Sequence, residues 1–471
     1  MTKQIVFAGM IGLTMSACCE RCEKTPATAA AAGGNAKVSP VTVKLMTLDP
    51  AHFHAALVQK FMYPQVDPVV HVYSPGGDDL QMHLKRIEGF NTRTNPPPTK
   101  WEEKVYTGPD FFEKMIAEKP GNVVVQSGNN GKKADYVLRC VQAGLNVLAD
   151  KPMAINPADF AKIREAFEVA KKNNVLLYDI MTERSEITTV LQREMSRAPD
   201  VFGELQKGTA EKPAISKESV HHYLKEVAGA PLKRPGWFFD TRQQGEGIVD
   251  VTTHLVDLIQ WEAFPEQTLS ETDVDVQSAK RWTSPISLEQ FSKVTGLAQF
   301  PEYLKGDVDV NGVLQPYCNG EMDYTLRGIH AKVSVIWNFE APPGAKDTHY
   351  SIMRGTKANL VIRQGKEQNY KPVVYVEKTC DEADAAFEAK LAAAVAKMQT
   401  NWPGVAFHRD GANWALDIPA KYDIGHEAHF AQVTERYLKY LAEGKLPAWE
   451  VPNMIVKYAT IMKAYELSRP K

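Results

Sequence analysis

Long apolar runs, blocks of single-sign charge and clustered cysteines are scarce in this chain of 471 residues. Lys and Arg (55) nearly balance Asp and Glu (57), so no basic excess indicates a nucleic-acid partner. An apolar run near the start, residues 5–15, is too short to cross a bilayer as a stable helix. With 44% hydrophobic residues, the chain is typical of a globular protein of two domains or more.

Metal-binding and disulfide patterns are also lacking. Of the six cysteines, Cys140, Cys318 and Cys380 follow residue 39, and they are too scattered for a disulfide framework or a metal site. His71 and His83 are not spaced as ligands with any acidic partner. The sequence therefore predicts no metal site.

The first 17 residues are predicted to form a secretory signal, because a basic start and a short apolar core precede small residues. The Ser-Ala-Cys that ends at Cys18 resembles the lipobox of a bacterial lipoprotein, with a plain cleaved signal as the alternative. Residues 18–39, rich in Ala, Gly and Thr, are predicted to be a flexible tether. We therefore expect an exported protein with a lipid on Cys18, anchored at the bacterial membrane and facing the periplasm or the exterior.

Residues 40–180 show short apolar strands that alternate with helices, a pattern typical of a doubly wound parallel sheet. The residues Asn156-Pro157, followed by Asp159, predict the start of one helix, since they supply a cap, a first-turn proline and an acidic first turn. This part is predicted to be a Rossmann-like dinucleotide-binding domain. The expected strands are 41–46, 69–73, 122–125, 146–149 and 175–178, and two further expected helices are 51–62 and 135–143.

The pattern changes in residues 181–471. Apolar residues alternate with polar ones over residues 331–339, which predicts a half-buried strand, and residues 360–363 predict another. Apolar residues at helical spacing mark residues 387–398 and 430–467. We expect an α+β domain with a large, mainly antiparallel sheet, and an α/β fold class for the whole chain.

Three segments resemble the Gfo/Idh/MocA family of oxidoreductases. Residues 143–152 end in Asp-Lys-Pro, similar to the family's strand and Glu-Lys-Pro motif, with Asp for Glu. Residues 245–257 resemble its glycine-rich Asp-xxx-His helix, and residues 430–468 look like its closing helices. The segment after residue 327 resembles the extended C-terminal domain of Bacteroidota-type members. The resemblance implies an NAD(P)-dependent oxidoreductase that acts on a sugar, glycoside or polyol.

The candidate catalytic residues are Lys151, Asp250 and His254. Asp250 and His254 are four residues apart, which predicts that they share one helix face. Oxidation of a secondary alcohol needs a group that accepts the hydroxyl proton, and histidine suits this near neutral pH. Asp250 is expected to orient the imidazole or hold substrate, and Lys151 to stabilise charge on the alcohol oxygen. Taken alone, the Asp-xxx-His pattern also fits a solvated helix face. Arg234 and Trp237 are candidate sugar contacts, although an aromatic run fits a core equally well.

The loop after the first strand contains no glycine, whereas dinucleotide folds usually carry G-x-G-x-x-G there. We expect Thr47 or His52 to help a helix N-terminus hold the pyrophosphate. Asp49 would repel the phosphate unless its side chain points away or caps the helix. A capped helix start without ligand is the alternative. Ser74, after the second strand, is the candidate for the ribose, and NAD and NADP both stay open. The resemblance adds further cofactor contacts, namely Ser127, Asn129, Asn130 and Lys151.

Two other functions remain open at this point. One is an NAD-dependent glycosidase or lyase that regenerates its cofactor in each cycle, which the expected exported location favours. The other is an anchored carbohydrate-binding protein with a decayed cofactor site, which the glycine-free loop favours and the Lys-Asp-His set opposes. The expected partners are a small carbohydrate and, through the lipid anchor only, a membrane. Nucleic acid is not expected, and a homo-oligomer stays open.

Overall fold

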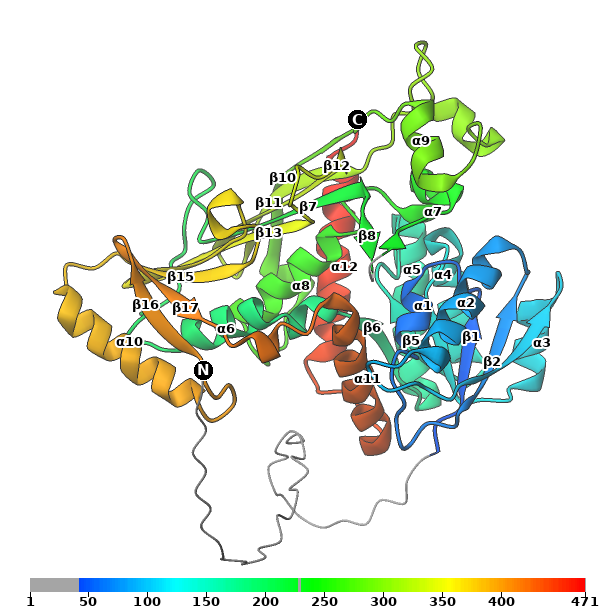
Figure 1. The fold of residues 1–471 in the computed structure, drawn as a ribbon, viewed down its shortest axis with the longest axis horizontal. Helices are drawn as coiled ribbons and strands as arrows, with labels where there is room; N and C mark the ends of the chain where they lie inside the picture. The colour runs from blue at the N-terminus through cyan, green and yellow to red at the C-terminus, as the bar shows by residue number, and fades with distance from the viewer. Residues whose placement is uncertain (1–41, 228–229, 471) are drawn as a thin grey trace, which may run out of the picture. The chain divides into compact units, whose positions relative to one another are not determined.

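The computed structural model describes residues 42–227 and 230–470. The predicted signal peptide, the tether and Cys18 lie outside the described residues. Residues 40–471 form one compact unit, which contains a six-stranded and a nine-stranded sheet (Figure 1). Within the described ranges, no helix is long and apolar enough to cross a membrane.

The first sheet is wholly parallel, with strand order β3-β2-β1-β4-β5-β6, which confirms the predicted doubly wound fold. Its central strands are buried and apolar, as expected when helices cover both faces. Because the strand order reverses between β1 and β4, their carboxyl ends mark the usual ligand crevice of such a sheet. The strands are β1 (Leu45–Leu48), β2 (Val69–Ser74), β3 (Glu102–Thr107), β4 (Val123–Gln126), β5 (Asn146–Asp150) and β6 (Leu177–Ile180).

The helices that accompany this sheet differ from expectation at one place. The helix predicted over residues 51–62 is only the four-residue α1 (His54–Leu57). The Ala51 and His52 amides bond to Asp49 and Ser127 before it, and the Gln59 and Lys60 amides bond three residues back in a turn after it. The predicted start at Asn156 is confirmed, since its side chain accepts from the Asp159 amide and Pro157 follows it. The other helices of this part are α2 (Asp78–Thr92), α3 (Phe111–Glu118), α4 (Asn130–Gln142) and α5 (Pro157–Asn173).

The second sheet has the order β10-β11-β12-β7-β13-β14-β15-β17-β16, and the pairing of β7 with β12 is its parallel one. Its mainly antiparallel character and the strands predicted at 331–339 and 360–363 are therefore confirmed. The strands are β7 (Ile215–Leu224), β10 (Val274–Trp282), β11 (Asn319–Leu326), β12 (Ile329–Glu340), β13 (Thr348–Arg354), β14 (Ala358–Arg363), β15 (Val373–Lys378), β16 (Ala406–Asp410) and β17 (Asn413–Asp417). A separate ribbon pairs β8 (Glu226–Val227) with β9 (Ala230–Pro231).

Two helices of the C-terminal part, α8 (Thr252–Ala263) and α12 (Glu450–Leu467), pack together beside this sheet (Figure 1). The predicted helical segments 387–398 and 430–467 are confirmed as α10 and as α11 with α12. The remaining helices are α6 (Ile187–Ser196), α7 (Thr241–Gln244), α9 (Leu288–Thr295), α10 (Asp384–Met398) and α11 (His426–Glu443).

A buried ionic network ties α8 and α12 to the end of the first sheet. Arg184, in the short 3-10 helix after β6, donates to both carboxylate oxygens of Asp257 at 2.6 and 2.7 Å, and to Glu450 at 2.9 Å. Lys457 of α12 donates to Asp179 of β6 and to Asp257. Asp257 thus anchors α8, the helix whose first turn carries His254.

Candidate functional site

The three predicted catalytic residues meet at the carboxyl end of β5. Lys151 directly follows that strand, and its Nζ lies 2.6 Å from Asp250 Oδ1. His254 lies in the first turn of α8. All three side chains line one cavity of about 110 Å³, together with Arg234. The structure therefore brings the two motifs, about a hundred residues apart in the chain, onto one site.

Asp250 does not sit where the spacing predicts. The helix α8 begins at Thr252, so Asp250 lies in the turn before it and not on a helix face shared with His254. Its carboxylate accepts from Lys151 and, at 3.1 Å, from Gln244 Nε2. Among the described residues, His254 Nδ1 has no hydrogen-bond partner. Asp250 therefore positions the lysine ammonium, and no hydrogen bond links it to the imidazole.

A close approach of two backbones fixes this turn. A Cβ on Gly247 would lie 1.8 Å from the carbonyl oxygen of Cys318, so only glycine fits between the turn and the segment that precedes β11. The Gly247 amide also donates to Tyr317. The glycine-rich run before Asp250 thus serves packing, and it places Asp250 opposite Lys151.

The imidazole of His254 is buried, and burial together with the nearby Lys151 ammonium lowers its pKa to about 3. The ring is therefore neutral through the physiological range. The neutral imidazole is the form that can accept a proton from a substrate hydroxyl.

Replacing Lys151 by methionine should raise the pKa of His254, because the substitution removes the cation that disfavours the imidazolium. The ring stays buried, so the pKa should remain below its usual value of about 6.5. NMR titration of the His254 ring in both proteins measures the change. An unchanged pKa would show that the ammonium does not act on the ring.

Of the two predicted sugar contacts, one lies on the cavity. Arg234 is buried, and its guanidinium donates to the carbonyls of Tyr223 and His222 while it stacks 4.3 Å from the Phe238 ring centre. Trp237 is also buried, but its indole N–H donates to Asp79 Oδ2 at 3.1 Å, and the residue is not part of the cavity lining. Trp237 therefore contacts α2 of the first sheet's part of the chain and does not line the cavity.

A larger cavity of about 490 Å³ adjoins the first, and the two share the lining residues Glu183, His221, Lys225, Val251, His254 and His426. Asp347, which lines the larger cavity, accepts from the His222 amide and from Lys225, and its carboxylate lies 3.2 Å from His221 Nδ1. These contacts hold the pKa of Asp347 well below its usual range despite burial. The residues predicted for the site did not include this group. The adjacent histidines near the end of β7 were its available signal, but only the nine-stranded sheet places Asp347 beside them.

The predicted cofactor contacts after β2 and β4 are mostly engaged with the protein itself. Ser74 Oγ accepts from the Gly76 amide, and Thr47 is buried within β1. Ser127 Oγ donates to Asp150 Oδ2. Asn129 caps α4 and donates to Gln243, while Asn130 donates to the Gln244 carbonyl and also lines the cavity.

The β1–α1 loop, residues 49–53, does not fit a pyrophosphate. The amides of Asp49, Ala51 and His52 already donate to the carbonyls of Tyr73, Asp49 and Ser127. A Cβ on Gly128 would lie 2.2 Å from the Asp49 carbonyl, so the loop closes directly on the end of β4. A cradle needs free amides and open backbone, and here three amides are engaged and the backbone is closed against Gly128. The Asp49 carboxylate turns toward Lys132 and Tyr136.

The nicotinamide end of a dinucleotide meets a better environment. Phe53, Phe238 and Val251 give the smaller cavity apolar walls beside Lys151 and His254. Its volume is about 110 Å³, whereas pockets that hold a whole drug-sized ligand measure roughly 300 Å³ or more. The cavity is therefore large enough for a single ring of the cofactor. The residues present thus fit the reacting ring of such a cofactor. Its phosphates would have to be bound by groups outside the β1–α1 loop.

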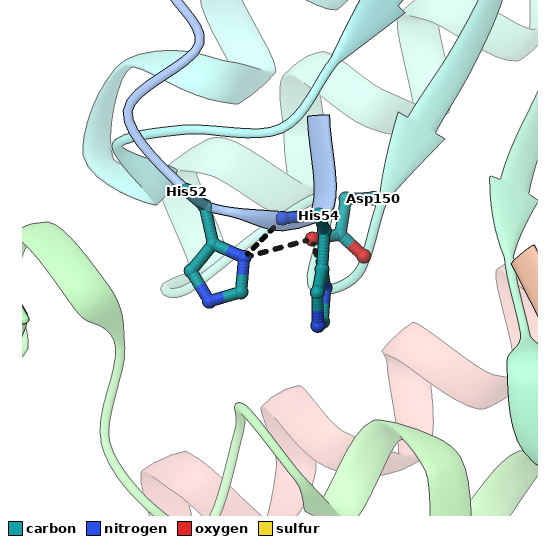
Figure 2. A group of neighbouring side chains, drawn as sticks. All are labelled: His52, His54 and Asp150. Atoms are coloured by element: carbon teal, nitrogen blue, oxygen red, sulfur yellow. Dashed lines mark hydrogen bonds and ion pairs between the residues drawn. The ribbon is translucent and has the colours of Figure 1, made fainter. Parts of the chain in front are cut away.

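The loop also carries a cluster that the sequence analysis missed. His52 lies in the loop, His54 begins α1, and Asp150 ends β5, and their ligand atoms all lie within 4.8 Å of one another (Figure 2). His54 Nδ1 is 2.9 Å and His52 Nδ1 is 3.8 Å from Asp150 Oδ2. The ligand types and their spacing are those of a metal site, and the prediction of no metal site did not consider these three residues. The signal was the His-x-His spacing, but the acidic member lies 96 residues after His54.

Two family models match most of the folded chain. Residues 191–469 match the model described as "Putative oxidoreductase C terminal domain". Residues 80–180 match the model described as "Oxidoreductase family, NAD-binding Rossmann fold". The second match begins after the β1–α1 loop, the segment in which the chain lacks the usual glycines.

Solved structures and a curated relative agree with these matches. A "putative oxidoreductase" from Parabacteroides merdae is 57% identical, with a TM-score of 0.88, and the match covers 91% of this chain and 98% of that one. A levoglucosan dehydrogenase in complex with NADH, 12% identical with a TM-score of 0.55, covers 90% and 98% and shows the same fold. A trans-1,2-dihydrobenzene-1,2-diol dehydrogenase from Xenopus laevis is 32% identical over 88 residues, which are 18% of this chain and about a quarter (26%) of that protein. The comparisons support an oxidoreductase with a nicotinamide cofactor and do not separate NAD from NADP.

Proposed function

Because the chain belongs to the Gfo/Idh/MocA oxidoreductases with the extended C-terminal domain, we propose that it oxidises or reduces a secondary hydroxyl of a sugar, glycoside or polyol. The observation that carries this proposal is the meeting of Lys151, Asp250 and His254 on one cavity. A nicotinamide cofactor, NAD or NADP, supplies the hydride chemistry when it is bound.

The side chains of the cavity supply the proton chemistry. The Lys151 ammonium, held by Asp250 at 2.6 Å, points a cation at the position of an alcohol oxygen and stabilises negative charge that develops there. Neutral His254 takes the hydroxyl proton during oxidation and returns it during reduction. His254 is buried and Lys151 is partly buried, so little water reaches them and these interactions are strengthened.

The larger cavity supports a carbohydrate as the substrate. Its volume of about 490 Å³ falls in the range of small-ligand sites, and it opens from His254 toward polar side chains on β7 and β13. Ser219, His221 and His349 offer hydrogen-bonding groups there, as a polyhydroxylated substrate requires.

A direct test separates the parts of this proposal. The protein is purified and denatured, and released dinucleotide is identified by mass spectrometry. The native protein is then incubated with a panel of glycosides and polyols, with and without added NAD or NADP, and carbonyl products are measured. Keto-sugar formation that depends on the dinucleotide supports the proposal. Specific binding of sugars with no redox product under any condition would instead favour a carbohydrate-binding protein.

We also propose that the protein is exported and anchored through a lipid on Cys18. The variant Cys18→Ser should move the protein from the membrane fraction to the soluble fraction, because the acyl chains supply the membrane affinity. Cys380→Ser, in the folded part, is the matched control and should leave the distribution unchanged. An unaltered distribution of Cys18→Ser would contradict lipidation at this residue.

A further inference from the structure

The His52, His54 and Asp150 cluster is a metal-ligand set on the edge of the sheet where a pyrophosphate cradle is usual. From its geometry we propose that these three residues bind one divalent transition-metal ion at the wall of the smaller cavity. The proposal concerns binding alone and does not depend on the oxidoreductase activity.

The donor atoms have the chemistry and spacing of a metal site. Two imidazoles and one carboxylate are the protein ligands of many zinc and non-haem iron sites that keep a position open for water or substrate. Metal–ligand distances near 2.1 Å place neighbouring donors of a tetrahedral ion roughly 3.4 Å apart. The distances of 2.9 and 3.8 Å from Asp150 Oδ2 to the two imidazoles lie on either side of that value.

Neighbouring groups hold the ligands in place. Ser127 Oγ donates to Asp150 Oδ2 at 2.9 Å, and buried Lys133 donates to the Asp150 carbonyl at 2.7 Å. Such supporting hydrogen bonds are typical around metal ligands, because they fix the donors before the ion binds.

The loop conformation favours the same conclusion. Its amides are spent on internal hydrogen bonds that present the two imidazoles to Asp150, instead of remaining free for a phosphate. All three ligands line the cavity that Lys151 and His254 also line, so an open coordination position would face the substrate.

Two cations near the cluster have other partners. Lys151 is paired with Asp250 at 2.6 Å, and Lys133 directs its ammonium to Asn130 Oδ1 and to the backbone carbonyls of Asp150 and Pro152. Neither ammonium therefore forms an ion pair with the Asp150 carboxylate.

The test uses untagged protein, so that no added histidines bind metal. The protein is stripped with a chelator, reconstituted with Zn²⁺ or Co²⁺, dialysed, and analysed for metal by mass spectrometry. One equivalent per chain is expected, and the Co²⁺ form should show the visible absorption of a nitrogen-ligated, low-coordinate site.

Variants assign the site. His52→Ala, His54→Ala and Asp150→Asn should each weaken Zn²⁺ binding at least about a hundredfold, and Ser127→Ala about ten- to a hundredfold, as for a supporting residue. His408→Ala removes a histidine from an exposed His–Asp pair on β16 and should leave binding unchanged. Circular dichroism checks the fold of each variant. Wild-type protein that binds no stoichiometric Zn²⁺ or Co²⁺, or folded His54→Ala that binds as tightly as wild type, would overturn the proposal.

Discussion

Lys151→Ala is expected to lower turnover on a confirmed substrate by at least about a hundredfold, because the substitution removes the cation that stabilises charge on the reacting oxygen. His254→Ala should cause a loss of similar size, since no other group takes the hydroxyl proton directly. The two residues act on one oxygen, so the double variant should lose much less than the product of the two effects. Steady-state kinetics on the three variants measures this.

The controls separate chemistry from folding. Lys162 forms an exposed ion pair with Asp135, and Lys162→Ala should leave turnover unchanged. Lys151→Met keeps most of the side-chain volume against Asp250 and should be as inactive as the alanine variant, with circular dichroism to check that it folds. Near-normal turnover in folded Lys151→Met or His254→Ala would contradict the assigned roles.

Arg184→Ala should destabilise the protein by about 3–5 kcal/mol, because it leaves Asp257 and Glu450 buried without their guanidinium partner. The loss should reach the site as well, since Asp257 anchors the helix that begins beside His254. Chemical denaturation measures the free energy of unfolding. Arg164→Ala removes a more exposed pair with Glu271 and should cost no more than about 1 kcal/mol.

This network also predicts how stability depends on pH. The Arg184 guanidinium and the Lys457 ammonium hold the pKa of Asp257 below its usual range. Its contribution is therefore complete above the unfolded-state pKa of about 3.9 and is lost as pH falls toward the folded-state value. In Arg184→Ala, the free energy of unfolding should therefore fall less between about pH 5 and pH 2 than it does in the wild-type protein. An equal stability of Arg184→Ala and wild type at neutral pH would contradict the role of the network.

The residues that carry local signals were predictable from the sequence. The apolar strands β4 and β5, the capped start of α5 and the alternation over β12 each depend on neighbouring residues, and the structure confirms them. Lys151 and His254 were found because each lies in a recognisable motif.

The missed features depend on contacts between distant segments. Helix α1 is shortened because His52 donates to the Ser127 carbonyl, a partner 75 residues later that no local pattern indicates. Asp250 pairs with Lys151 because Gly247 allows its turn to pack against Cys318. The cluster of His52, His54 and Asp150 also depends on such contacts, because the sheet brings the segment after β1 beside the end of β5.

The central claim is that this cavity transfers a hydride to or from a sugar carbon, with Lys151 and His254 on its oxygen. The most direct measurement uses a substrate that carries deuterium on the carbon bearing the reacting hydroxyl. We predict that turnover by the wild-type protein moves this deuterium from the sugar into the recovered nicotinamide, and that Lys151→Met fails to do so. Retention of all deuterium on the original carbon, without any keto product, would contradict the account.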